Sequence, residues 1–165
     1  QIDVTPGASV ADFGCGSGYF SFEFAKVVGS EGKVYALDIL PSALEAVASR
    51  AKILHLGNIT PKRVNLEREG GSGLGMTSVD WVVLKDMLFQ NEHKGVILKE
   101  VSRVLKPGGS AIIMEWNPKA SAVGPEKSLR IDPETLKALL SEAGLSADRN
   151  LPAGGYHYAF LAKKA

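Results

Sequence analysis

Short apolar runs alternate along the chain with stretches in which apolar residues recur at helical spacing. This alternation is typical of an α/β protein, in which helices cover a mostly parallel sheet. The runs that predict strands are Ala8–Phe13, Lys33–Asp38, Arg63–Leu66, Val79–Leu84, Ser110–Glu115, Leu145–Asn150 and Tyr156–Ala162. Only a few residues, with the turn-forming sequence Pro-Ala-Gly-Gly, separate the last two runs, which predicts an antiparallel pair at the end of the sheet.

Helical periodicity fills most of the intervals between these strands. A first helix follows the first strand, because Phe20, Phe24 and Val28 recur on one face. Pro41 opens a second helix that runs to about His55. A third helix carries its apolar face from Val96 to Leu105 and stops at a Lys-Pro-Gly-Gly sequence, and a fourth lies between Asp132 and Gly144. Residues 68–77 contain four glycines, so we expect a loop there.

The composition bounds the range of functions. A chain of 165 residues is long enough for one domain over residues 1–165. Nineteen basic and eighteen acidic residues give a net charge of +1, which disfavours a nucleic-acid partner. Cys15 is the only cysteine, so we expect no disulfide and no metal site. No signal peptide and no run long enough for membrane insertion is visible, and we expect a cytoplasmic protein.

The turn from the first strand into the first helix carries the most informative residues. Gly14, Gly16 and Gly18 alternate there, and glycines let the backbone approach a ligand at the positive end of a helix dipole. A tight turn without a ligand would explain the glycines alone. Asp38, however, ends the second strand, where a carboxylate can accept hydrogen bonds from both hydroxyls of an adenosine ribose. The combination predicts an adenosine-containing cofactor.

The glycine spacing separates two kinds of cofactor. The dinucleotide fingerprint G-x-G-x-x-G requires glycine at position 19, where this chain has Tyr19. The segment Asp12-Phe13-Gly14-Cys15-Gly16-Ser17-Gly18, with Asp38 on the next strand, instead resembles motif I and the acidic loop of class I S-adenosylmethionine-dependent methyltransferases.

Two later segments, residues 78–86 and 100–109, are similar to the fourth-strand and post-fourth-strand motifs of that family, so the resemblance covers almost the whole chain. The nearest branch is the small-molecule type similar to the enzymes of ubiquinone and menaquinone biosynthesis. The resemblance implies a Rossmann-like, doubly wound sheet of seven strands in the order 3-2-1-4-5-7-6, with strand 7 antiparallel and helices on both faces. It also implies an enzyme that uses S-adenosyl-L-methionine.

The same resemblance assigns roles to individual positions. Residues of the glycine loop would hold the methionine end of the cofactor, Asp38 the ribose and Ile39 the adenine face, while Lys85 would line the floor of the site or lie in a solvated loop. Asn65 stands where the family often has an aspartate, and its amide can still hydrogen-bond adenine. The implied cofactor-binding residues are Asp12, Gly14, Cys15, Gly16, Gly18, Asp38, Ile39, Asn65, Leu66 and Lys85.

Methyl transfer from a sulfonium needs alignment and exclusion of water more than it needs an acid–base pair. If the acceptor must lose a proton, the candidates are Asp86, Glu115 and His157. A histidine within a strand is more often structural than catalytic. Trp116 could shape an acceptor pocket or simply be a hydrophobic residue, and Arg130 could pair with an anionic acceptor or with a surface carboxylate.

Two motifs that the chain lacks narrow the class of methyl acceptor. The segment after the fourth strand lacks the Asn/Asp-Pro-Pro-aromatic element of enzymes that methylate adenine or glutamine nitrogen, and no cysteine cluster is present for arsenic. A small organic acceptor is therefore expected. Two alternatives remain at this point: a non-catalytic, regulatory cofactor-binding domain, and an NAD-dependent oxidoreductase.

Overall fold

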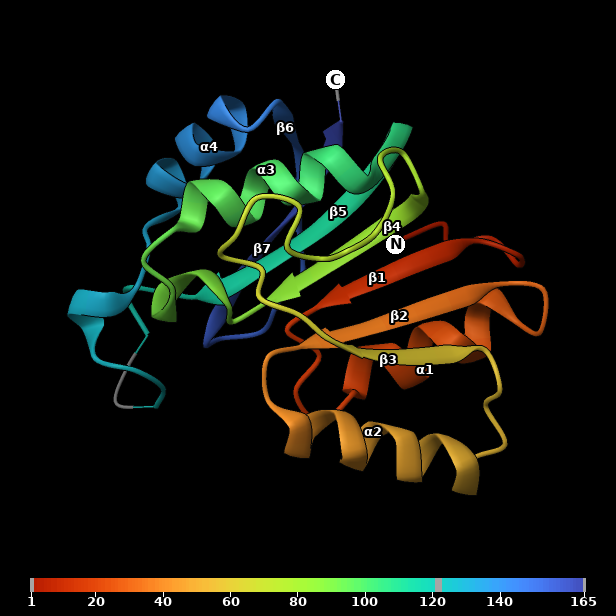
Figure 1. Cartoon of the computed structure of the whole chain (residues 1–165). Coiled ribbons are helices and arrows are strands. Elements are labelled where there is room, and N and C mark those ends of the chain that lie inside the picture. Colours follow the sequence, from red (N-terminus) through yellow and green to blue (C-terminus); the bar gives the residue numbers. More distant parts are fainter. Residues whose placement is uncertain (1, 121–122, 165) are drawn as a thin grey trace.

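Seven strands form one sheet in residues 2–120 and 123–164, which are the residues that the computed structural model describes (Figure 1). The strands are β1 (Ser9–Phe13), β2 (Lys33–Asp38), β3 (Ile59–Arg63), β4 (Val79–Lys85), β5 (Leu105–Trp116), β6 (Leu145–Leu151) and β7 (His157–Lys164). The helices are α1 (Tyr19–Val28), α2 (Pro41–Ile53), α3 (Lys94–Val104) and α4 (Pro133–Glu142), with single 3₁₀ turns η1 (Leu88–Gln90) and η2 (Lys127–Leu129).

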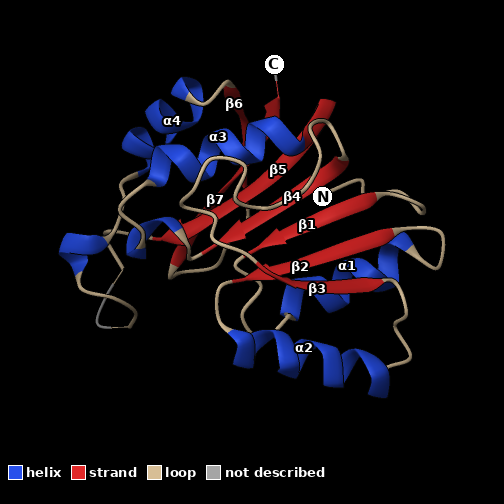
Figure 2. Ribbon diagram, viewed as in Figure 1, coloured by secondary structure: helices blue, strands red, loops and turns tan. Residues whose placement is uncertain are grey.

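The strand order is β3-β2-β1-β4-β5-β7-β6, as the family resemblance implied. β7 pairs antiparallel with both β5 and β6, and the other pairs are parallel. Helices α1 and α2 cover one face and α3 and α4 cover the other (Figure 2). The strands after β1 extend the sheet to one side and the strands after β4 extend it to the other. In such sheets ligands bind beyond the carboxyl ends of the two strands where the order reverses, here β1 and β4.

Apolar side chains from both faces of the sheet form the core. The face under α3 and α4 holds the largest buried cluster, which includes Leu84, Ile113 and Leu136. On the other face, α1 packs Phe24 and Val28 over the first strands. The central strands are buried on both sides, which explains why they appear in the sequence as continuous apolar runs.

The third strand differs from the sequence prediction. It spans Ile59–Arg63 rather than Arg63–Leu66, and it contains Pro61. Proline lacks a backbone N–H, but β3 is an edge strand, so only one side needs ladder donors and proline is tolerated. The earlier end of the strand places Val64, Asn65 and Leu66 in the loop that follows it, beyond the carboxyl end of β2.

The glycine-rich segment after β3 is a loop, as predicted, and it is fastened to α3. Glu100 is buried and accepts hydrogen bonds from the backbone N–H and the hydroxyl of Ser72. Arg103 donates to Glu100 and to the carbonyl oxygen of Leu74 at 2.7 Å. Burial acts to raise the pKa of Glu100, but the bonds from Arg103 and Ser72 outweigh it and lower that pKa. These contacts hold the loop against α3.

Candidate cofactor and acceptor site

A cavity of about 520 Å³ opens at the carboxyl ends of β1, β2 and β4. Its lining comes from the glycine loop, the ends of β2 and β4, the loop after β3 and the η1 turn. Eight of the lining residues are sequence-predicted site residues: Gly14, Gly16, Asp38, Ile39, Asn65, Leu66, Lys85 and Asp86. The structure therefore brings most of the predicted site to one place.

The glycine loop has the conformation that its sequence requires. Gly14, Gly16 and Gly18 all lie in the left-handed region, with φ of 76°, 50° and 83°. Side chains with a Cβ adopt this region only at a cost of about 1–2 kcal/mol per residue. The N–H groups of Gly14 and Cys15 both donate to the carbonyl oxygen of Leu37, at 2.8 and 2.9 Å, which fastens the loop to β2.

The three glycines differ in what surrounds them. A Cβ at Gly14 would clash with the Met87 side chain, and one at Gly18 would lie 2.8 Å from Val47 Cγ2 and 3.0 Å from the Phe22 ring. Gly16 has no such neighbour within 4 Å and faces open space in the cavity. Gly14 and Gly18 thus permit close packing, whereas Gly16 leaves room beside the backbone.

Asp38 links the end of β2 to the glycine loop. One carboxylate oxygen accepts from the Gly16 N–H at 2.9 Å, and the other accepts from the Leu40 N–H at 3.0 Å. An ionised carboxylate offers about four lone-pair positions, so two of them remain for a ligand.

Three of the predicted cofactor-binding residues, Asp12, Cys15 and Gly18, do not line the cavity. Asp12 is buried and accepts a 2.7 Å hydrogen bond from the Ser21 hydroxyl in α1. Burial raises the pKa of this carboxyl to about 6, against the lowering effect of Ser21. Burial likewise raises the pKa of the Cys15 thiol to about 12, so the thiol stays protonated. These three residues therefore contribute to the packing of the glycine loop and not to the cavity surface.

At the other end of the cavity, Lys85 and Asp86 terminate β4. The backbone of Asp86 is left-handed, with φ of 52°, and its N–H donates to the carbonyl oxygen of Met114 at 2.9 Å. Aspartate tolerates this conformation better than most residues do. The Asp86 carboxylate is paired with the Lys85 ammonium and lies 3.0 Å (Oδ1) and 3.1 Å (Oδ2) from Nε2 of His157.

His157 opens β7 and stacks on Trp116 at the end of β5, with ring centroids 4.2 Å apart. The structure therefore gathers Asp86, Trp116 and His157 from three strand ends. His157 does not line the cofactor cavity itself, but it contacts Asp86, which does.

Glu115, the third catalytic candidate, lies on the face of the sheet opposite to Trp116 and His157, because side chains alternate along β5. It is fully buried, and its Oε1 accepts from the Leu88 N–H at 2.7 Å in the η1 turn. Within the described residues, its Oε2 has no hydrogen-bond donor. Burial is the main cause that raises the pKa of Glu115 to about 7, and the nearby Asp86 charge adds to it.

Six residues that line the cavity have no signal in the sequence pattern: Leu40, Val64, Glu67, Met87, Gln90 and Asn91. The last three lie in or beside η1, a single turn too short to show periodicity. Val64 belongs to the loop that had been predicted as strand. The clash of a Cβ at Gly14 with Met87 is a tertiary contact that no local pattern announces.

Arg130 forms no ion pair with a carboxylate in residues 2–120 and 123–164, and pairing with an anionic acceptor stays a prediction. Its guanidinium donates to the carbonyl oxygens of Asn117, Ala120, Val123 and Pro125, and it lies over the Trp116 ring, 5.9 Å from its centroid. Arg130 organises the connection between β5 and α4.

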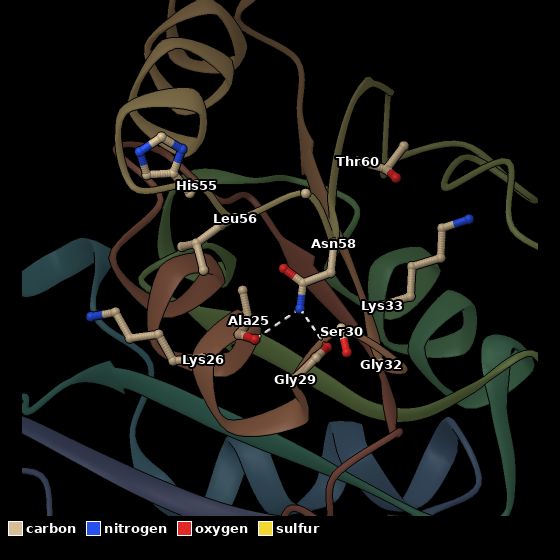
Figure 3. Close-up of a pocket in the computed structure, with 11 residues that line it drawn as sticks. Ala25, Lys26, Gly29, Ser30, Gly32, Lys33, His55, Leu56, Asn58 and Thr60 are labelled. Atoms are coloured by element: carbon tan, nitrogen blue, oxygen red, sulfur yellow. Dashed lines mark hydrogen bonds between the residues drawn. The ribbon is translucent and has the colours of Figure 1, made fainter.

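A second cavity, of about 580 Å³, lies at the amino ends of β2 and β3 (Figure 3). There the Asn58 amide donates to the carbonyl oxygens of Ala25 and Gly29, both at 2.8 Å, and so satisfies the carboxyl end of α1. This cavity lies at the end of the sheet opposite to the glycine loop. Asn58 has a structural role there, because its amide satisfies carbonyl oxygens at the carboxyl end of α1.

Among the described residues, no helix is long and apolar enough to cross a membrane, and no group of three or more His, Cys, Asp or Glu side chains could hold a metal ion.

Comparison with known proteins agrees with the geometry. The model of a family described as "Methyltransferase domain" matches residues 5–149. The chain is 30% identical over 177 aligned positions to the ubiquinone/menaquinone biosynthesis C-methyltransferase UbiE of Burkholderia multivorans, with 89% of this chain and 71% of the relative covered.

Two solved structures share the fold. One is a SAM-dependent methyltransferase from Aquifex aeolicus, with a TM-score of 0.88 at 24% identity over 98% of this chain and 84% of that chain. The other is a putative type 11 methyltransferase from Sulfolobus solfataricus, with a TM-score of 0.77 at 22% identity over 94% and 83%. With the family match over residues 5–149 and the strand order of the sheet, the chain belongs to the class I S-adenosylmethionine-dependent methyltransferases.

Proposed function

We propose that the protein transfers the methyl group of S-adenosyl-L-methionine by in-line displacement to a small organic acceptor. The observation that carries this proposal is the cavity that extends from Asp38 and the glycine loop to Lys85 and Asp86. A carboxylate for a ribose thus lies at one part of the cavity, and a polar strand end next to a histidine and a tryptophan lies at another.

The contacts support a role for each part of the cavity. Asp38 retains acceptor capacity for the two ribose hydroxyls after its bonds to the Gly16 and Leu40 N–H groups. Ile39 is half exposed and can cover one face of the adenine. Asn65 accepts from the Glu67 N–H through Oδ1, so its amide N–H groups remain for a ring nitrogen of adenine.

The open space beside Gly16 suits the approach of the methionine portion to the loop backbone. Asp12, Cys15 and Gly18 would act through the shape of the loop, because they do not line the cavity. The sulfonium of the cofactor is already activated, so the protein's work is to hold the acceptor atom in line with the methyl carbon and to exclude water.

The relatives support a small acceptor. UbiE is named as a C-methyltransferase of ubiquinone and menaquinone biosynthesis, and hydroquinones are therefore the first acceptors to test. A cytoplasmic location is part of the proposal, supported by the buried, unpaired Cys15.

Calorimetric titration with S-adenosylhomocysteine, beside NAD at the same concentrations, tests the cofactor. We expect micromolar or tighter binding of S-adenosylhomocysteine and none of NAD. Labelled S-adenosylmethionine with a panel of hydroquinones, phenols and amines then tests transfer. Tight binding without transfer to any of these would favour a regulatory domain, and binding of NAD alone would favour an oxidoreductase.

A further inference from the structure

The ends of β4, β5 and β7 bring three side chains into one contiguous group beside the cofactor cavity. Asp86 lines the cavity, His157 contacts Asp86 through Nε2, and Trp116 stacks on the His157 ring. The ring and the carboxylate are held but not sealed, because 15% of the His157 side chain and 18% of the Asp86 side chain are exposed. His157 itself lines another pocket of about 410 Å³, between the start of α4 and the β6–β7 pair. The Asp86–His157 pair therefore connects the cofactor cavity with a pocket that can hold the acceptor.

Two of the three ionisable candidates near the cavity are already engaged by other groups of the protein. Glu115 is fully buried under the η1 turn, where its Oε1 accepts from the Leu88 N–H. The Asp86 carboxylate is occupied by the Lys85 ammonium and the His157 ring. Neither carboxylate is left as the group that takes a proton from an acceptor.

The geometry also fixes which nitrogen of His157 can act. A carboxylate accepts hydrogen bonds, so the nitrogen that faces Asp86 carries the proton in the neutral ring. With Nε2–H directed to Asp86, the free lone pair belongs to Nδ1. The His157 ring packs against Trp116 at an interplanar angle of 35°, and a carboxylate–imidazole pair is an arrangement that general bases use in proteins.

We propose that His157 is the general base of the methyl transfer and that Asp86 is the positioning residue that fixes its tautomer. This inference rests on the proposed function, and it limits the acceptor to molecules with an ionisable hydroxyl or similar group. Nδ1 takes the proton of that group, and the oxygen or other heteroatom that loses the proton bonds to the methyl carbon. The bond between sulfur and the methyl carbon breaks, its electron pair stays on sulfur, and S-adenosylhomocysteine is released. The proton leaves His157 to solvent afterwards.

Nitrogen NMR of the ¹⁵N-histidine-labelled protein tests the arrangement without any acceptor. The chain has three histidines, and His157→Gln assigns the signal. We expect neutral His157 to show the Nε2–H tautomer alone, with an unprotonated Nδ1. The Asp86→Asn variant, whose amide is a weaker acceptor, should turn this into a mixture of tautomers. An Nδ1–H tautomer, or a ring that stays doubly protonated up to pH 9, would overturn the proposal.

The His157→Gln variant separates catalysis from cofactor binding. The glutamine amide of His157→Gln can still donate to Asp86 but has no basic nitrogen. We expect S-adenosylhomocysteine affinity within about twofold of the parent, since His157 does not line the cofactor cavity, and transfer to the best hydroquinone reduced by about 10²-fold or more.

Added imidazole should restore part of the activity of His157→Ala. His55→Gln, the same replacement at an exposed site at the amino end of the sheet, is the control and should leave both readouts unchanged. Full transfer by His157→Gln would refute the base, whereas a parent protein that binds no S-adenosylhomocysteine would refute the proposed function instead.

Discussion

Single residues decide whether the cofactor cavity binds its ligand. Asp38→Ala removes a carboxylate that accepts from two backbone N–H groups and retains capacity for two more bonds. We expect binding of S-adenosylhomocysteine to weaken by about 1.5–3 kcal/mol, the range for hydrogen bonds to a charged group. Calorimetry measures the change, and circular dichroism checks that the fold is kept. Asp148→Ala, far from the cavity on β6, is the matched control; unchanged affinity in Asp38→Ala would remove Asp38 from the site.

Gly16 and Gly18 lie two positions apart, but we expect them to respond differently to substitution by alanine. Gly18→Ala puts a methyl group against Val47 and Phe22, so it should lower the free energy of unfolding by about 2–4 kcal/mol. Gly16→Ala meets only backbone strain, of about 1–2 kcal/mol, but Gly16→Val should abolish cofactor binding because its side chain fills the cavity. Chemical denaturation and calorimetry separate the two effects. Tight binding by Gly16→Val would contradict the assignment of the loop.

At the scale of elements, Glu115 ties β5 to η1 at a cost that depends on pH. Its folded-state pKa of about 7 lies above the ordinary 4.5, so folding favours the protonated carboxyl. The stability that this carboxyl provides is complete below about pH 4.5 and is lost as the pH rises to about 7. The gap between the two values corresponds to about 3 kcal/mol.

Glu115→Gln, which imitates the protonated acid, should therefore match the parent near pH 4.5 and exceed its stability at pH 8 by up to about 3 kcal/mol. Urea denaturation at several pH values measures the difference. The exposed Glu142→Gln, which should show no such dependence, is the control. A parent and a Glu115→Gln variant with parallel pH profiles would show that Glu115 is ionised without penalty.

Most elements could be predicted from the sequence, because their apolar spacing is set by the layers they belong to. β1, β2 and β4 are buried runs, and α4 begins where Asp132 caps it through bonds to Glu134 and Thr135. β3 could not be placed correctly, because Pro61 lacks a backbone N–H and is compatible with a strand only at a sheet edge, which the sequence does not reveal. The antiparallel β6–β7 pair followed from a short turn.

The candidate site was predictable in the part that depends on backbone geometry. The glycine loop and Asp38 follow from strand ends and turn chemistry, and both reach the cavity. Asp12 shows the limit, since its motif position does not reveal that its carboxylate turns to Ser21. The pairing of Asp86 with His157 joins positions 71 residues apart, and only the position of β7 beside β5 brings them together.

Taken as a whole, the molecule has two unlike ends. The carboxyl end of the sheet holds the glycine loop, Asp38 and the Asp86–His157 pair, whereas the amino end holds a cavity in which Asn58 caps α1. Hydrogen exchange should separate them. We expect S-adenosylhomocysteine to slow exchange in residues 14–18, 38–40 and 64–67, and to leave residues 29–33 and 55–60 unchanged.

The central strands β1 and β4 should exchange most slowly with or without the ligand, because they are buried and paired on both sides. Mass spectrometry of peptic fragments resolves these segments. Protection at the amino-end cavity on addition of S-adenosylhomocysteine would place the ligand in the wrong half of the molecule.

Gly14 and Met87 come from the turns after β1 and β4, and a Cβ at position 14 would clash with the Met87 side chain. The residues at positions 14 and 87 are therefore coupled in evolution. A lineage that acquires alanine at position 14 must move the Met87 side chain or replace it with a smaller one. The same holds in the laboratory: a chimaera that exchanges the segment after β4 can keep Gly14, whereas one that brings a residue with a Cβ to position 14 must also accommodate or replace Met87.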